Sequence, residues 1–364
     1  MDCDFVVPAQ PEELLEADER RFFVEEDAPV TDMDTEEFET SLSELVSRLR
    51  DSGSCALSQH ENFDLLFMAV KDWSQLEAAV RSELVTIVSS FFNQHIHNLA
   101  SLAATAAAGG NKASAEHYVA IRSHRRVLKM YTFLTAWMLM QGEKLAARAP
   151  GGPGLAVLPA RRRGAKKQQQ SEDSETSRWE TDREKLLNTL DSLFSNQSPE
   201  WWHSGRIDDD LSNIVVSCVV NLVENPQSLR ARGVKDLSMS VMVGLSQCQG
   251  LESACNTGAS FLNALMRSEH VPAYVAELLF SMSTHGEGYQ QVGSGLMREI
   301  SRIPVSEFMR DAAGAKNAST FLCEISDRLP RLANQNISFL MCFLDGEAYQ
   351  LRSSIVHMVG NIVA

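Results

Sequence analysis

The sequence has no uninterrupted apolar run long enough to cross a membrane, which takes about 20 mostly apolar residues. Its opening, MDCDFVVPAQPEELLEADER, also lacks the basic segment and the apolar segment that together make a secretory signal. We therefore expect neither secretion nor a membrane-spanning segment.

Proline and cysteine are both scarce, with 11 and 7 residues in a chain of 364. The cysteines are odd in number, scattered, and mostly placed within apolar helical patterns, which is typical of reduced thiols in an intracellular protein. They are Cys3, Cys55, Cys218, Cys248, Cys255, Cys323 and Cys342. We expect no disulfide framework.

The chain has little positive charge at its start. Residues 1–40 hold 15 acidic side chains against Arg20 and Arg21, a net charge of −13 out of the −15 of the whole chain, which leaves −2 for residues 41–364. A nearly neutral body has no global field that would attract nucleic acid. DNA contact would then need local patches or partner subunits.

No segment shows the period-two alternation of strands bounded by hairpin turns, whereas helical spacing is frequent. Apolar residues from Phe38 to Leu49 follow i, i+3, i+4 spacing, and Ser58 with Glu61 forms a capping box before the next helix. Further helices are expected from Ser74 to the break at Gly109, and over 114–147. The chain is predicted to be all-α.

Residues 149–177 combine Pro, Gly, a basic run and an acidic Ser/Thr stretch, a composition that cannot bury a core. We expect a disordered linker there. Beyond it, helices are expected at 178–195, 208–223, 228–247, 251–267, 271–283, 287–301, 315–329, 334–344 and 347–363.

Helices of this length joined by short turns, pairing every 35 to 45 residues, are typical of a HEAT-type α-solenoid. The predicted organisation has four parts. They are an acidic, largely extended tail at 1–35, a first helical block at 36–148, the linker at 149–177, and a second helical block at 178–364. The last helix keeps its apolar stripe up to Ala364, so we expect the array to continue beyond it.

Motifs that carry chemistry are missing from the sequence. His95 and His97 are two residues apart on a helix and point in different directions, so they cannot grip one metal ion. Gly293-Ser294-Gly295 lacks the rest of a dinucleotide fingerprint, and no phosphate loop, GxSxG, HExxH or kinase signature occurs. We expect no enzyme activity, metal, cofactor or small-molecule substrate.

Two basic clusters are candidate sites. Arg161, Arg162, Arg163, Lys166 and Lys167 place five positive charges in seven linker positions, which indicates either a nuclear-import or phosphate-contact segment or a solvated charge run. Arg122, Arg125, Arg126 and Lys129 form either a basic ridge or an ordinary solvated helix face. Phosphorylation of the nearby Ser171, Ser174, Thr176 or Ser177 would offset the basic run.

Trp201-Trp202 is a further candidate, because adjacent tryptophans either anchor a partner or pack against the second helical block. We favour packing.

Three strings in the second block resemble one family. They are Glu224-Asn225-Pro226, the segment from Phe321 to Pro330 (FLCEISDRLP), and the segment from Phe343 to Arg352 (FLDGEAYQLR). Lys129-Met130-Tyr131 and the opening residues Phe5, Pro8, Leu14 and Leu15 agree in order and spacing. Together they resemble the N-terminal domain of the condensin complex subunit 1 family, although the acidic tail and the insertion at 109–112 depart from it.

The resemblance implies a regulatory HEAT subunit without catalytic activity, which binds the kleisin subunit and works beside the structural-maintenance-of-chromosomes (SMC) ATPases in mitotic chromosome condensation. It also implies contact with chromatin or DNA through composite surfaces, and residence in the nucleus and on mitotic chromosomes, with a possible cytoplasmic pool. No membrane partner is implied. An unrelated HEAT adaptor, such as a transport receptor or a phosphatase scaffold, is the alternative, and an enzyme with an unrecognised helical site is a third.

Overall fold

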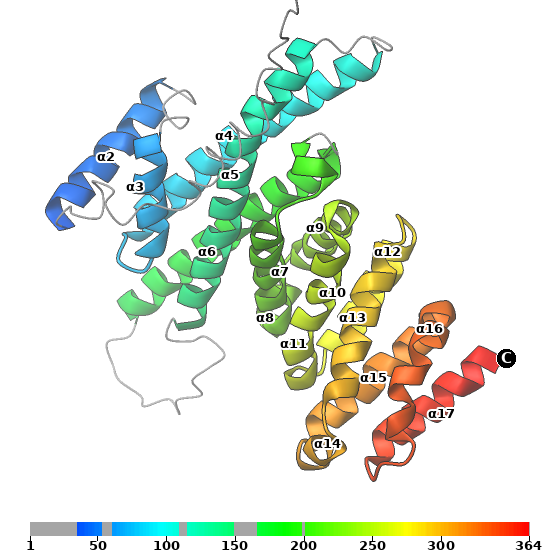
Figure 1. Cartoon of the computed structure of the whole chain (residues 1–364). Helices are drawn as coiled ribbons and strands as arrows, with labels where there is room; N and C mark the ends of the chain where they lie inside the picture. Colours follow the sequence, from blue (N-terminus) through cyan, green and yellow to red (C-terminus); the bar gives the residue numbers. More distant parts are fainter. Residues whose placement is uncertain (1–34, 53–59, 109–114, 149–165, 199–200, 364) are drawn as a thin grey trace, which may run out of the picture.

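A computed structural model describes residues 35–52, 60–108, 115–148, 166–198 and 201–363 (Figure 1). Within these ranges the regular elements are all helices, which confirms the all-α prediction. Most of the predicted acidic tail lies outside the described residues, as do residues 149–165 of the predicted linker. No helix in the described ranges is long and apolar enough to cross a membrane.

Four helices make up the N-terminal part. They are α2 (Thr35–Ser52), α3 (His60–Lys71), α4 (Ala78–Ala108) and α5 (Ala115–Arg148). Their ends agree with the breaks expected at Gly53 and Gly109. The apolar stripe of α3 packs on α5, where the Phe67 ring lies 4.7 Å from Trp137 and 6.0 Å from Phe133, measured between centroids.

Helix α6 (Lys166–Asn196) begins twelve residues earlier than the sequence predicts. Residues 166–177 were expected to belong to the linker, and this expectation is wrong. Their Lys, Gln and Glu side chains cannot form a core, but they favour helix, so the segment extends a helix that is anchored further along by Leu186, Leu187 and Leu190.

The remaining helices follow at short intervals. They are a 3-10 turn η4 (His203–Gly205), α7 (Asp209–Glu224), α8 (Pro226–Arg230), α9 (Val234–Cys248), α10 (Leu251–Ser260), α11 (Leu262–Arg267), α12 (Val271–Ser283), α13 (Gly288–Arg302), α14 (Val305–Arg310), α15 (Ala312–Arg328), α16 (Pro330–Leu340), η5 (Met341–Phe343) and α17 (Tyr349–Val363). Most agree with the predicted ranges to within three residues.

Local chain chemistry explains where the array departs from the prediction. The helix expected at 228–247 is split because Gly233 adopts a left-handed conformation (φ 76°) between α8 and α9. The Asn225 side chain accepts a hydrogen bond from the Gln227 backbone N–H, which starts α8 at Pro226. Helix α14, a single short segment after Pro304, was not predicted from the sequence.

The helices form two layers that run side by side (Figure 1). One layer contains α5, α7, α10, α13 and α16, and the other contains α6, α9, α12, α15 and α17, each helix packing on the next in its own layer. Pairs across the layers, such as α5 with α6 and α16 with α17, complete the repeats. This arrangement is an α-solenoid, as predicted.

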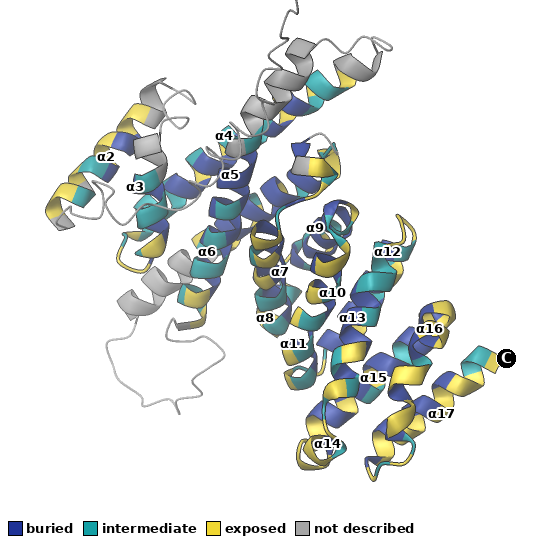
Figure 2. Cartoon of the chain, in the orientation of Figure 1, coloured by how far each residue is buried: buried dark blue, intermediate teal, exposed yellow. Residues whose placement is uncertain are grey.

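The predicted linker does not separate two independent helical groups in the described chain. Helix α6 lies against α4 and α5 on one side and against α9 on the other, and α5 packs on α7. The α5–α6 pair is therefore the first repeat of the array. Figure 2 shows buried residues where the layers meet and exposed residues on the outer faces.

Trp201 and Trp202 lie in the interior, 0% and 1% exposed. The Trp202 indole N–H donates to Gln197 Oε1 at 3.0 Å. The packing interpretation is confirmed, and these rings are not free to anchor a partner.

The α5–α6 contact requires a glycine. A Cβ atom at Gly142 on α5 would overlap the ring of Trp179, which comes from α6. We expect Gly142→Ala to lower the free energy of unfolding by about 1–3 kcal/mol, because the ring must shift to make room. Urea unfolding followed by circular dichroism measures this change.

Gly360→Ala is the matched control, since nothing lies within 4 Å of a Cβ atom at that position of α17. We expect it to leave stability unchanged or slightly raised. Equal loss of stability in both variants would contradict the close-contact explanation.

Candidate functional site

The predicted import segment is only partly described. Arg161, Arg162 and Arg163 lie outside the described residues, whereas Lys166 and Lys167 open α6. The basic segment keeps its five positive charges whether or not its last two residues are helical. The segment stays a prediction.

The predicted basic ridge on α5 does not include an exposed Lys129. This side chain is 7% exposed, and its Nζ lies 2.8 Å from Asp208 Oδ2, just before α7. Lys129 therefore connects α5 to α7. Arg125 is half-buried, the side chains of Arg122 and Arg126 are not described, and the remaining ridge stays a prediction.

A buried carboxylate joins α5, α6 and α8. Glu143 is 4% exposed, and its Oε1 accepts hydrogen bonds from Trp179 Nε1 at 2.9 Å and from Arg183 Nη1 at 3.0 Å. Its Oε2 accepts from Ser228 Oγ at 2.6 Å. We call Glu143, Trp179, Arg183 and Ser228 the junction cluster. Its charges are matched within the protein, so it is a structural contact and not an open site.

Removing the junction carboxylate should be costly. Glu143→Ala leaves the Arg183 guanidinium buried without its partner, and breaking a buried pair in this way costs about 3–5 kcal/mol. We expect that loss in the free energy of unfolding by urea titration. Glu252→Ala, at an exposed glutamate, is the control, and a similar loss in both variants would contradict the role of the junction cluster.

The cysteines in the described part of the chain are free thiols. Burial raises the pKa of the Cys218 thiol, with a smaller effect from the nearby Glu143 charge. Burial likewise raises the pKa of Cys248, to about 12. Both side chains are therefore protonated core residues. Within the described ranges, no group of three or more His, Cys, Asp or Glu side chains could hold a metal ion.

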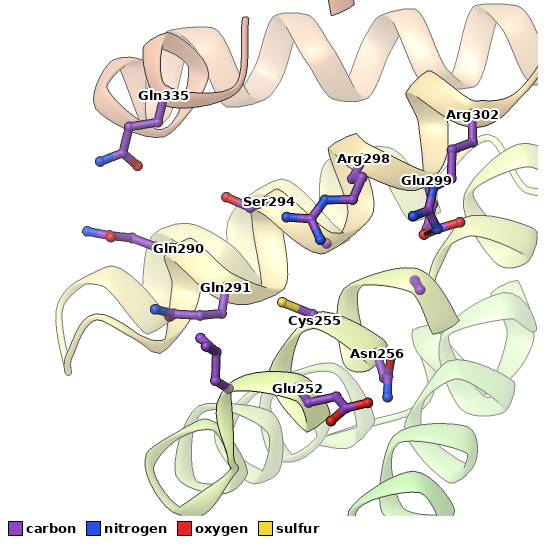
Figure 3. A pocket seen from close by; sticks show the side chains of 13 residues that line it. Glu252, Cys255, Asn256, Gln290, Gln291, Ser294, Arg298, Glu299, Arg302 and Gln335 are labelled. Carbon is purple, nitrogen blue, oxygen red and sulfur yellow. Dashed lines mark hydrogen bonds and ion pairs between the residues drawn. The ribbon is translucent and has the colours of Figure 1, made fainter. Parts of the chain in front are cut away.

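An open groove of about 600 Å³ lies between α10, α13 and α16 (Figure 3). Polar side chains on α13 face it in one row of i, i+4 spacing, formed by Gln290, Ser294, Arg298 and Arg302. Such a row lies along one face of the helix and gives the groove its length. We call this site the amide groove.

The amide groove has two further walls. Glu252, Cys255 and Asn256 come from α10, and Gln335 comes from α16. The floor is low because α10 and α13 approach closely at Gly295, where a Cβ atom would overlap the Cys255 carbonyl oxygen. The groove forms because long side chains surround a position where Gly295 has no side chain to fill the space.

The charges at the amide groove are distributed unevenly. Arg302 pairs with Glu299, one helical turn away. The Arg298 guanidinium instead lies over the Phe339 ring, 5.7 Å from its centroid, and has no carboxylate within ion-pair distance among the described residues. No histidine lines the groove in the described chain. The arrangement suits binding.

This groove was not predicted from the sequence. Cys255 was expected to be a reduced thiol and Gly293-Ser294-Gly295 an incomplete dinucleotide fingerprint, and both lie at or beside the α10–α13 contact. The only signal in the sequence was the polar row at 290, 294, 298 and 302. A polar row of this kind is typical of any exposed helix face, so it does not single out a site.

The fold and these sites define a helical-repeat protein of the solenoid class, with a buried polar junction at its first repeat and a polar groove between later ones. The model of the family described as "non-SMC mitotic condensation complex subunit 1, N-term" matches residues 78–246, from α4 into α9.

Proteins named as condensin subunits are similar to this chain. Condensin complex subunit 1 of Mus musculus is 24% identical over 99% of this chain and 24% of its own length. Condensin-1 complex subunit CAP-D2 of Arabidopsis thaliana is 23% identical over 95% of this chain and 24% of its own length. Condensin complex subunit 1 of Xenopus laevis is 23% identical over 94% of this chain and 24% of its own length.

Residues 78–246 therefore match the model of this family, and the chain is similar along most of its length to the N-terminal region of condensin complex subunit 1. The resemblance seen in the sequence is confirmed. The chain spans about a quarter of the length of these curated relatives. A crystal structure of an engineered protein aligns over 98% of this chain with 10% identity, but its TM-score of 0.16 supports no conclusion.

Proposed function

We propose that this chain forms part of a non-catalytic scaffold subunit of a condensin complex. The observation that carries the proposal is the similarity over 94–99% of the chain to three proteins named as condensin subunits from animals and a plant. The continuous two-layered array supports it, because solenoids offer long surfaces for holding other chains together. Catalysis would then belong to the SMC ATPases.

The proposal includes its partners. A kleisin subunit and the SMC ATPases would bind the array, and chromatin would be contacted through surfaces shared with those subunits during mitotic condensation. The near-neutral charge of residues 41–364 supports shared contacts, since the body has no strong positive field of its own. The related proteins are condensin subunits, which favours this function over a transport or phosphatase adaptor.

Affinity purification of the tagged chain from mitotic cells tests the proposal. We expect a kleisin and both SMC ATPases to be recovered and identified by mass spectrometry. The Glu143→Ala variant, which weakens the first repeat, is expected to recover less of them than the wild type. Recovery of import cargo or of a phosphatase in place of these subunits would contradict the proposal.

We further propose that Arg161, Arg162, Arg163, Lys166 and Lys167 act as a nuclear-import segment. Their charge density supports this role. Replacing all five with alanine in a fluorescent fusion is expected to move the interphase signal from the nucleus to the cytoplasm. Alanine keeps the helix propensity at the start of α6. An unchanged nuclear signal would contradict the role.

A further inference from the structure

We propose that the amide groove binds an extended segment of another polypeptide chain, and that this segment presents an acidic side chain to Arg298. The inference goes beyond the proposed function, because it concerns one surface and does not depend on which complex contains the chain. It follows from the shape of the groove, its side-chain amides and its charge.

The shape fits a short stretch of extended chain. The polar row on α13 runs from Gln290 to Arg302, about 18 Å along the helix at 1.5 Å per residue. An extended polypeptide rises about 3.3 Å per residue, so the row matches about five residues. A volume of about 600 Å³ is also within the range of ligand-binding clefts.

The side-chain amides suit a peptide backbone. Gln290, Gln291, Gln335 and Asn256 line the groove from three helices (Figure 3), and none of these amides is hydrogen-bonded to another described side chain or backbone group. Each primary amide both donates and accepts, as a peptide unit does. Four such groups can therefore bond N–H and C=O groups of an extended chain whatever its side chains are.

The charge of Arg298, near one end of the polar row on α13, determines which side chain of the bound segment is favoured there. Arg298 is exposed and held against Phe339, so its guanidinium is already oriented but lacks an anionic partner in the described chain. A carboxylate is the partner that its planar donors fit best. Glu252 and Glu299 balance Arg298 and Arg302 in the lining, so the groove has no net positive charge to hold the continuous phosphate charge of a nucleic acid. A polypeptide with one acidic residue is therefore favoured.

The first experiment selects ligands from a displayed library of random linear heptapeptides against the 364-residue chain. We expect enriched sequences that share one Asp or Glu. Synthetic copies are expected to bind Arg298→Glu about tenfold or more weakly than the wild type in fluorescence anisotropy, through loss of one charge-assisted contact and added repulsion. Arg310→Glu, at an exposed arginine outside the groove, should bind normally.

The second experiment locates the peptide. Cys255 lies in the groove, so a bound peptide is expected to slow its alkylation by maleimide, followed by peptide mass spectrometry, while exposed Cys342 reacts at an unchanged rate. Ser294→Trp, which fills the groove, should abolish binding, and its thermal unfolding shows whether the fold is kept.

Some outcomes would overturn the proposal. These are the absence of any enriched sequence, selected peptides that bind Arg298→Glu and wild type equally, or peptides that leave Cys255 unprotected. Protection of Cys255 by a single-stranded oligonucleotide and not by peptides would also overturn it, and would assign the groove to phosphate groups. A failed co-purification of condensin subunits would leave the peptide result unaffected, so the two proposals fail separately.

Discussion

The position of the first repeat depends on the buried carboxylate of Glu143. Helices α5 and α6 are separated by residues 149–165, so no short turn sets their relative position, and side-chain contacts must do so. Glu143 accepts hydrogen bonds from Trp179 and Arg183 on α6 and from Ser228 on α8. A buried charge is tolerated only where all its hydrogen-bond partners are in place. The Glu143 carboxylate therefore favours the one relative position of α5, α6 and α8 in which all three partners reach it.

The polar contacts around this junction extend the same constraint to neighbouring helices. Asp182 on α6 accepts a hydrogen bond from Ser82 on α4 at 3.0 Å, and Asn93 on α4 donates to Thr189 on α6 at 3.0 Å. Lys129 on α5 reaches Asp208 before α7. Each of these pairs specifies one relative position of its two helices. The N-terminal helices and the repeats are therefore aligned by directional bonds as well as by close packing.

Much of the fold could be predicted from the sequence because its signals are local. Helical spacing, the Gly109 break and the Asn225-Pro226 start each act within a few residues, and the structure reproduces them. The errors have two causes. The helix from Lys166 and the break at Gly233 are local, because helix-favouring side chains extend α6 and a left-handed glycine divides α8 from α9. The buried Lys129 and the amide groove depend instead on neighbours distant in the chain. A polar or charged residue looks exposed in the sequence until a second helix covers it.

The amide groove has a mechanical consequence. Its walls come from α10, α13 and α16, which are successive members of one layer, and α10 and α13 touch at Gly295 with almost no side chain between them. In a solenoid, small rotations between neighbouring repeats set the curvature of the whole. Since the helices are closest at Gly295, a rotation of one repeat against the next about this contact would change the width of the groove. A polypeptide segment bound in the groove would stiffen the array at that point. Binding in the groove and the curvature of the solenoid would then each influence the other.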